Sequence, residues 1–118
     1  MRKQGGRQLD TTKKVYIAGP MTGVEEFNKK AFYDAAAMIA SYGLTPVHTA
    51  DMPLGLTYDE YIQESLSRIV GCDVIYLLKG YENSVGVMEY ELPYAKKNGM
   101  EIVIQGGAEE DALFGLLN

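Results

Sequence analysis

The run Val74-Ile75-Tyr76-Leu77-Leu78 is the most apolar stretch of the chain, and it predicts a buried β-strand. A short polar loop over residues 79–83 follows it, and residues 84–99 then have the pattern of a helix that ends at glycine. This order places the loop and the first helical turns at the carboxyl end of the strand. In open α/β sheets, ligands bind at that end.

Similar units occur along the rest of the chain. Short β-branched or aromatic runs alternate with segments whose apolar residues recur every three or four positions. The predicted strands cover residues 14–19, 44–47, 74–78 and 101–105, and the predicted helices cover residues 24–42, 58–70, 84–98 and 109–117. This alternation predicts an α/β fold with a parallel sheet and right-handed crossovers.

Two of the predicted helices show a clear buried face. In the first, the apolar stripe is expected to contain Phe27, Ala31, Ala35, Met38 and Ile39. In the second, Thr57 and Glu60 have the spacing of a capping box, so the helix should begin near residue 58. Its face toward the sheet is predicted to consist of Tyr61, Ser65, Leu66, Ile69 and Val70.

Length and composition limit the class of protein. The 118 residues suit one domain, expected over residues 14–118, with residues 1–13 as a disordered basic leader. No apolar run approaches the roughly 18 residues of a membrane span, and the leader lacks the apolar part of a signal peptide. The single cysteine, Cys72, excludes an internal disulfide and fits the reducing cytoplasm.

The charge is unevenly distributed. The formal net charge is −5, although residues 1–14 hold five basic residues and one acidic residue. A domain this acidic is poorly suited to nucleic acid, whose phosphates require clustered lysine and arginine. With one cysteine and one histidine, His48, a structural zinc site is not expected.

The loop after the first strand, Gly19-Pro20-Met21-Thr22-Gly23, is a candidate binding loop. A glycine loop between a strand and a helix lets backbone N–H groups approach an anion. The same glycines also suit a simple tight turn. The spacing is not the G-x-G-x-x-G of a dinucleotide site.

Glu91 is the strongest candidate for a reactive side chain, because a carboxylate near the carboxyl end of a strand can act as nucleophile or base. Glu89 competes for this role, and the two cannot share a helical face because they lie two residues apart. A solvated helix face is the alternative for either one. His48 follows the second strand and is either an acid–base group or a polar loop residue. Tyr16 by itself is more typical of a core aromatic.

Three segments occur in a recognisable order: Val15 to Gly23, Gly71 to Leu78, and Ser84-Val85-Gly86 with Glu91-Leu92-Pro93-Tyr94-Ala95. Together they resemble the nucleoside 2-deoxyribosyltransferase superfamily, and most closely its small phage and bacterial branch. The likeness runs from about Lys14 to Ile104. It implies a flavodoxin-like three-layer sandwich with a parallel sheet of four to five strands.

The resemblance also implies cleavage or transfer at the N-glycosidic bond of a 2′-deoxynucleoside or its monophosphate. In that superfamily a glutamate attacks the anomeric carbon, and a second base or water resolves the covalent deoxyribosyl-enzyme. Glu91 matches this glutamate, since it lies eight residues before Gly99 and precedes Leu92-Pro93-Tyr94-Ala95. Tyr16 matches the tyrosine that orients the nucleophile. No cofactor is required.

The implied pocket and assembly follow from the same resemblance. The loop from Gly19 to Gly23 would hold the sugar or its 5′ end, and Ser84 and Gly86 would line the same pocket. A homo-oligomer is implied as well, with the apolar segment 113–117 as a candidate buried edge.

Two positions depart from the superfamily pattern. Its base-assisting aspartate would lie eight residues before Asp73, where this chain has Ser65, which is not a comparable acid. Such a group typically contributes a factor of roughly 100 to 10,000 in rate. Glu89 or His48 would have to replace it, or the reaction would be slow or lost. Thr22 stands where phosphate-preferring members have arginine, which favours nucleosides or a different nucleotide-like ligand.

Three functions therefore stay open at the level of sequence. The first is a deoxyribosyltransferase, and the second is an N-glycosidase that passes the sugar to water. The third is a protein that binds or sequesters a nucleotide-derived ligand without turnover, which the serine at position 65 favours. An interaction module that uses the same fold is a further alternative.

Overall fold

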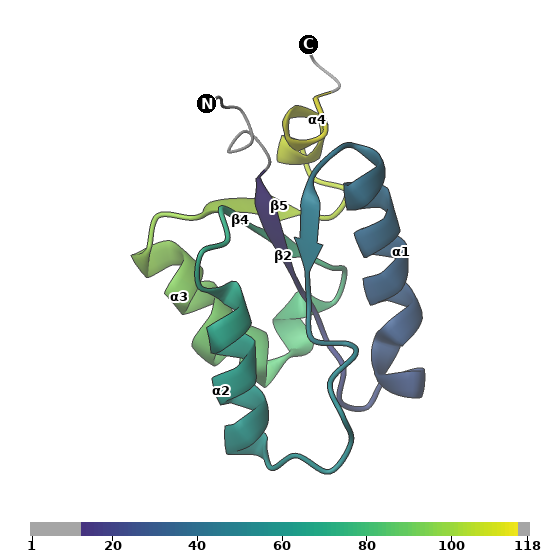
Figure 1. The fold of residues 1–118 in the computed structure, drawn as a ribbon, viewed down its shortest axis with the longest axis vertical. Coiled ribbons are helices and arrows are strands. Elements are labelled where there is room, and N and C mark those ends of the chain that lie inside the picture. The colour runs from purple at the N-terminus through teal and green to yellow at the C-terminus, as the bar shows by residue number, and fades with distance from the viewer. Residues whose placement is uncertain (1–12, 116–118) are drawn as a thin grey trace, which may run out of the picture.

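A computed structural model describes residues 13–115 (Figure 1). Its four strands are β2 (Lys14–Ala18), β3 (Thr45–Val47), β4 (Val74–Leu77) and β5 (Glu101–Ile104). They form one parallel sheet in the order β3-β2-β4-β5. This order, with the second strand outside the first, is that of flavodoxin-like sheets and confirms the predicted fold class. Except for Lys13, the predicted basic leader lies outside the described residues.

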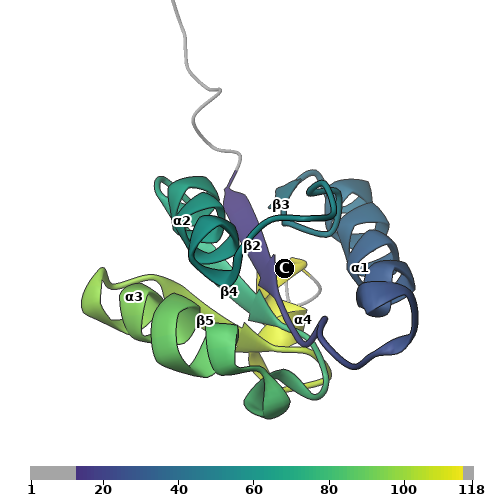
Figure 2. The same ribbon diagram turned by 90° about the horizontal axis from the view of Figure 1, so that it is seen from below.

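Helices cover both faces of the sheet (Figure 2). Helix α1 (Lys29–Ser41) and the short α4 (Glu109–Leu113) pack on one face, and α2 (Tyr58–Ile69) and α3 (Leu92–Lys97) pack on the other. Because successive side chains of a strand point to opposite faces, the residues of β2 contribute alternately to the two cores. In the described part of the chain, no helix has the length and apolar character needed to span a membrane.

The capping signals of the sequence are confirmed. Thr57 Oγ1 accepts the Glu60 N–H at 3.1 Å, and Glu60 Oε1 accepts the Thr57 N–H at 2.8 Å, which completes the predicted capping box. Ser84 Oγ accepts the Val87 N–H at 3.2 Å at the start of the helix that follows β4.

The buried face of α2 differs from the prediction at two positions. Ile62, Ser65 and Ile69 are its buried residues, whereas Val70 is 62% exposed. Val70 has extended backbone angles, φ −60° and ψ 129°, and has already left the helix. Its side chain therefore does not continue the stripe that the helical spacing predicts.

The first helix begins later than predicted. A short turn, η2 (Glu25–Asn28), precedes α1, and its residues Glu26, Phe27 and Asn28 have φ values of 50°, 55° and 62°. This left-handed turn is held by a hydrogen bond from Asn28 Nδ2 to the Pro20 carbonyl at 2.9 Å. Phe27 is consequently 46% exposed and outside the buried stripe, which consists of Phe32, Ala35 and Ile39.

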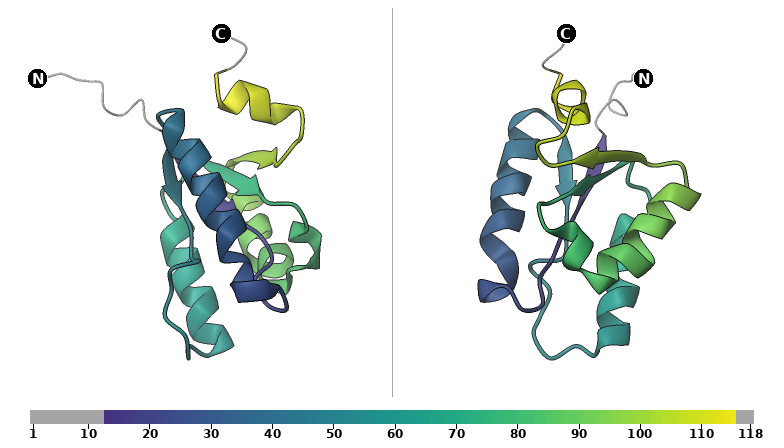
Figure 3. Two further views of the ribbon diagram at one scale, coloured as in Figure 1. Left: turned by 90° about the vertical axis from the view of Figure 1, so that its right-hand side faces the viewer. Right: turned by 180° about the vertical axis from the view of Figure 1, so that it is seen from behind.

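The end of the described chain belongs to the protein's own core. Leu113 and Phe114 are buried, and the Phe114 ring stacks on Tyr42 with centroids 4.7 Å apart. The sequence suggested the segment 113–117 as an edge buried between subunits; Leu113 and Phe114 are already buried within the chain, and Leu116 and Leu117 lie outside the described residues. Figure 3 shows α4 at the opposite end of the molecule from the loop that precedes α2.

Candidate active site

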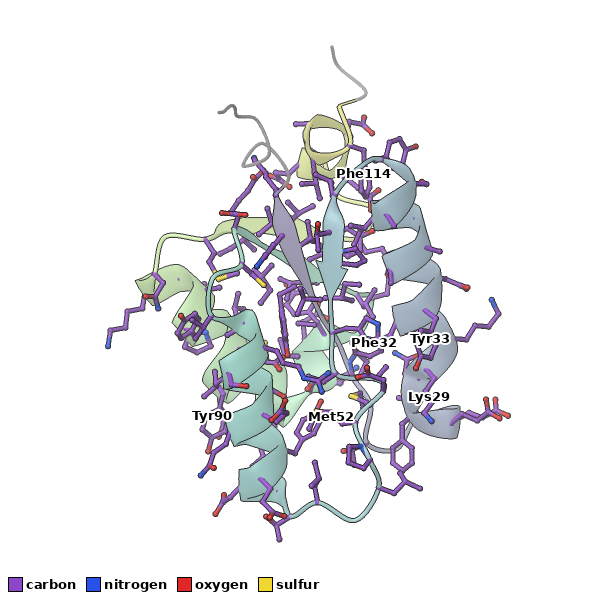
Figure 4. All side chains as sticks on the ribbon, viewed as in Figure 1. Lys29, Phe32, Tyr33, Met52, Tyr90 and Phe114 are labelled. Atoms are coloured by element: carbon purple, nitrogen blue, oxygen red, sulfur yellow. The ribbon has the colours of Figure 1, made fainter. Side chains whose placement is uncertain are left out.

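A cavity of about 590 Å³ opens at the carboxyl end of the strands. Its walls come from three loops, one after each of β2, β3 and β4. The chain passes from β2 to β3 on one side and later to β4 on the other, so the cavity lies at the switch point of the sheet, where α/β proteins bind ligands. Figure 4 shows two of the lining residues, Lys29 at the start of α1 and Met52 on the loop before α2.

Glu91 and Tyr16 meet in the wall of this cavity. Glu91 lines the cavity although it is only 4% exposed, and Tyr16 is fully buried in β2. The Tyr16 hydroxyl donates to Glu91 Oε2 at 2.6 Å, a length typical of a hydrogen bond to a carboxylate. Burial and the neighbouring charge of Glu91 raise the pKa of Tyr16. The phenol therefore stays protonated and acts as a donor.

The helix that carries Glu91 contains a π turn. The segment η4 (Val87–Glu91) leads directly into α3, and the Leu92 N–H donates to the Val87 carbonyl five residues earlier. Pro93 has no N–H, so in a regular α-helix it would leave the Glu89 carbonyl without its usual donor. The wider turn places Glu91 and Leu92 together on the buried side.

Glu91 and Glu89 have different environments, as their spacing requires. Glu89 is exposed and does not line the cavity, whereas Glu91 faces it. Burial raises the pKa of Glu91, and the hydroxyls of Tyr16 and Ser65 oppose this rise. Of the two carboxylates, Glu91 alone is placed to act on a molecule bound in the cavity.

His48 lies apart from Glu91. Its Nδ1 accepts the Ala50 N–H at 3.1 Å, and its ring makes an edge contact with Tyr33 at a centroid distance of 5.3 Å. Burial lowers the pKa of His48, and the residue does not line the cavity. The structure therefore favours the alternative in which His48 is a polar loop residue and not an acid–base group. Across residues 13–115, no group of three or more histidine, cysteine, aspartate or glutamate side chains is arranged to hold a metal ion.

Ser65 lies beside the Tyr16–Glu91 pair. Its side chain is fully buried on α2, and its hydroxyl has no hydrogen-bond partner among the described residues. The hydroxyl nevertheless faces Glu91, Tyr16 and Tyr61 closely enough to lower the pKa of each. Ser65 is therefore a buried polar group beside the Tyr16–Glu91 pair, although it does not itself line the cavity.

Most of the predicted loop residues line the cavity. Gly19, Pro20, Met21 and Thr22 do so, as do Ser84, Val85 and Gly86, whereas Gly23 does not. Met21 is held in place because its sulfur accepts a hydrogen bond from the Tyr61 hydroxyl at 2.9 Å.

One wall of the cavity was not predicted from the sequence. It consists of residues of the loop between β3 and α2, together with Tyr58 and Tyr61; the loop residues are Thr49, Ala50, Met52, Pro53, Leu54, Gly55 and Leu56. Arg68 holds this loop against α2, since its Nη1 donates to Asp51 Oδ1 at 2.7 Å and to the His48 carbonyl at 2.8 Å. The sequence signal that could have indicated this wall is the apolar loop that follows the predicted strand 44–47.

The turn η2 and the first residue of α1 supply two further lining residues that the sequence did not predict. Phe27 and Lys29 both face the cavity. The left-handed backbone of η2 rotates Phe27 out of the buried stripe of α1. Lys29 is exposed and brings a positive charge to the same edge.

Gly19 allows a close approach between the loop after β2 and the end of β4. A Cβ atom at this position would lie 2.8 Å from Leu78 Cβ and 2.9 Å from Leu78 Cδ1. We expect Gly19→Ala to lower the free energy of unfolding by about 1–3 kcal/mol, since overpacking forces neighbouring atoms to move. Urea titration of both proteins measures this difference.

Gly86→Ala is the matched control. Gly86 lines the same cavity, but its φ is −59° and an added Cβ would make only ordinary contacts, with Ile62 Cδ1 at 3.4 Å and Ser84 Oγ at 3.9 Å. Because glycine is unfavourable in a helix by about 1 kcal/mol relative to alanine, Gly86→Ala should keep or increase the stability. Equal destabilisation by the two substitutions would contradict the proposed steric role of Gly19.

The ionisation of Glu91 predicts a pH-dependent stability difference for Glu91→Gln. Burial raises the pKa of Glu91 in the folded protein, so the folded state binds this proton more tightly than the unfolded state. The wild type therefore loses stability as the pH rises from the unfolded to the folded pKa. Above that range, Glu91→Gln should be more stable by about 1 kcal/mol, a usual gain when a buried functional group that opposes folding is replaced.

Urea titrations above and below that pH range test this prediction. The stability gap should narrow as the pH falls, because the protonated carboxyl is neutral like the amide. A gap that stays constant with pH would show that Glu91 does not cause it.

A family profile described as a domain of unknown function, DUF4406, matches residues 13–104. The chain belongs to this family. No curated protein matches the sequence. The family description names no activity, so it leaves the chemistry of the DUF4406 domain to be argued from the site.

The fold of this DUF4406 domain is similar to that of a solved protein described as a 2-desoxiribosyltransferase from Leishmania mexicana. The TM-score is 0.63, and 21% of the aligned residues are identical. The match covers 78% of this chain and 63% of that chain, so the domain spans less than two thirds of its neighbour. At this level of identity, the likeness establishes the shared fold.

Proposed function

We propose that the protein cleaves or transfers at the N-glycosidic bond of a 2′-deoxynucleoside or its monophosphate. The observation that carries the proposal is the Tyr16–Glu91 pair, a buried carboxylate that faces a cavity of about 590 Å³. This volume lies within the range of about 300–1,000 Å³ usual for small-molecule sites. The superfamily motifs and the fold shared with a 2-desoxiribosyltransferase support the same activity.

In the proposed mechanism, Glu91 is the nucleophile. A carboxylate oxygen attacks C1′ of the deoxyribose while the electron pair of the N-glycosidic bond leaves with the base. The Tyr16 hydroxyl holds the other carboxylate oxygen, Glu91 Oε2, by a 2.6 Å hydrogen bond and so fixes the direction of attack. A second base or water then attacks C1′ and releases the glutamate.

Release of free base tests the proposal. The protein is incubated with a panel of 2′-deoxynucleosides and their 5′-monophosphates, and products are separated by liquid chromatography. Lys29 brings a positive charge to the cavity, so the monophosphates belong in the panel although Thr22 replaces the arginine of phosphate-preferring relatives. We expect release of base that depends on the protein.

The acceptor is determined in the same experiment. A new nucleoside that appears when a second base is added identifies a transferase, and free deoxyribose in the absence of an acceptor identifies an N-glycosidase. No release of base from any member of the panel would contradict both forms of the proposal.

A second candidate function is binding or sequestration of a nucleotide-derived ligand without turnover. The observation that favours it is Ser65, a serine at the position of the expected acid. Calorimetry with the same panel distinguishes the two functions. Tight binding that is unchanged in Glu91→Gln, with no release of base from either protein, would support sequestration.

A further inference from the structure

The cavity contains a nucleophile but lacks a group suited to protonate a departing base. Among the described residues, the titratable side chains that line it are Lys29, Tyr58, Tyr61 and Glu91. Lysine and tyrosine are weak acids at neutral pH, and desolvation raises the pKa of both tyrosines further. The serine and threonine hydroxyls that also line the cavity, and the buried hydroxyl of Ser65, are still weaker acids. A base that leaves as an anion would therefore receive no proton from the protein.

We propose that the preferred substrates are 2′-deoxynucleosides whose base is already a cation, of which an N7-alkylated purine is the simplest. This inference rests on the proposed function. As the N9–C1′ bond breaks, its electron pair neutralises the charged ring, and the base leaves as a neutral molecule without a proton transfer. A Glu91 oxygen forms the new bond to C1′. Water then attacks C1′ and displaces the glutamate, and the proton of that water passes to solvent.

The lining of the cavity suits a positively charged base. The Glu91 carboxylate supplies the opposite charge, and the rings of Phe27, Tyr58 and Tyr61 offer faces on which a cation binds favourably. The formal net charge of −5 attracts cations to the protein as a whole. Lys29 opposes this attraction, but it is exposed at the edge of the cavity.

A comparison of 2′-deoxyguanosine with 7-methyl-2′-deoxyguanosine tests the inference in the wild-type protein. Spontaneous loss of base is measured with Glu91→Gln and subtracted. We expect the methylated substrate to react at least about 100-fold faster, the lower end of the usual contribution of acid catalysis. Its spontaneous lability also favours it, so the pH dependence provides the stricter test.

The ratio of the two rates is measured at about pH 6.5 and about pH 5.5. Guanine becomes an equivalent cation only when solvent protonates its N7, so the rate of 2′-deoxyguanosine relative to the methylated nucleoside should rise roughly tenfold over this interval. The ratio cancels the titration of Glu91, which both reactions share. A ratio independent of pH, or similar rates for the two substrates, would overturn the inference and leave the proposed function intact. No release above Glu91→Gln from either substrate would overturn both.

Ser65→Asp provides a second test, because it places a carboxyl group beside Glu91. Release from 2′-deoxyguanosine should increase at least about tenfold, while release from the methylated substrate should not increase. Ser65→Asn has the same shape without an acidic proton and should give no gain with either substrate. An equal gain for both substrates in Ser65→Asp would show that protonation of the base is not what the wild type lacks.

Discussion

Replacing Glu91 by glutamine is expected to reduce the release of base from a 2′-deoxynucleoside by at least about 1,000-fold. Glutamine has the size of glutamate, and its amide oxygen can still accept the hydrogen bond from Tyr16. The amide is not a nucleophile, so the variant retains the geometry and loses the covalent step. The initial rate of base release at saturating substrate measures this effect.

Glu89→Gln is the matched control for this substitution. Glu89 lies on the same π turn, two residues earlier, but is exposed and does not line the cavity. The same chemical change at this position should leave the rate within about twofold of the wild type, as surface substitutions usually do. A large loss of activity in Glu89→Gln together with normal activity in Glu91→Gln would show that Glu89, and not Glu91, is the nucleophile.

Tyr16→Phe is expected to reduce the rate by about 10- to 100-fold, because small displacements of a reacting group cost factors of this size. The substitution removes the donor to Glu91 Oε2 and leaves the carboxylate free to rotate. It should also move the acidic limb of the pH–rate profile to higher pH. The Tyr16 hydroxyl lowers the pKa of Glu91, so without it the carboxylate is protonated at a higher pH and activity is lost sooner as the pH falls.

Tyr76→Phe separates this effect from a general loss of packing. Tyr76 is fully buried on the neighbouring strand β4, faces the other side of the sheet and donates to Glu110 rather than Glu91. Removal of its hydroxyl should change the stability but leave the acidic limb in place. Equal shifts of that limb in the two variants would mean that Tyr16 does not act through Glu91.

The fold could be predicted from the sequence because its signals are local. The apolar run 74–78 and the capping box at Thr57 each fix an element within a few residues, and parallel topology follows from the alternation of strands and helices. The start of α1 could not be predicted in this way. Three consecutive left-handed residues in η2 accompany the hydrogen bond from Asn28 to Pro20, a contact within the loop that no residue pattern of a helix announces.

The candidate site could be predicted only in part. Spacing left Glu89 and Glu91 as alternatives, and the superfamily resemblance favoured Glu91, which the structure places beside Tyr16. The π turn that turns Glu91 inward reflects the missing N–H of Pro93, a cue that is visible in the sequence but whose outcome depends on packing. Lys29 reaches the cavity only because η2 sets where α1 begins.

Intact mass spectrometry of the protein, after acid quenching during turnover of a 2′-deoxynucleoside, tests most directly whether Glu91 is the nucleophile. We expect an added deoxyribosyl group on the wild type, mapped by peptide analysis to Glu91, and no adduct on Glu91→Gln. An adduct that also forms on Glu91→Gln, or that maps to another residue, would contradict the assignment of Glu91 as the nucleophile.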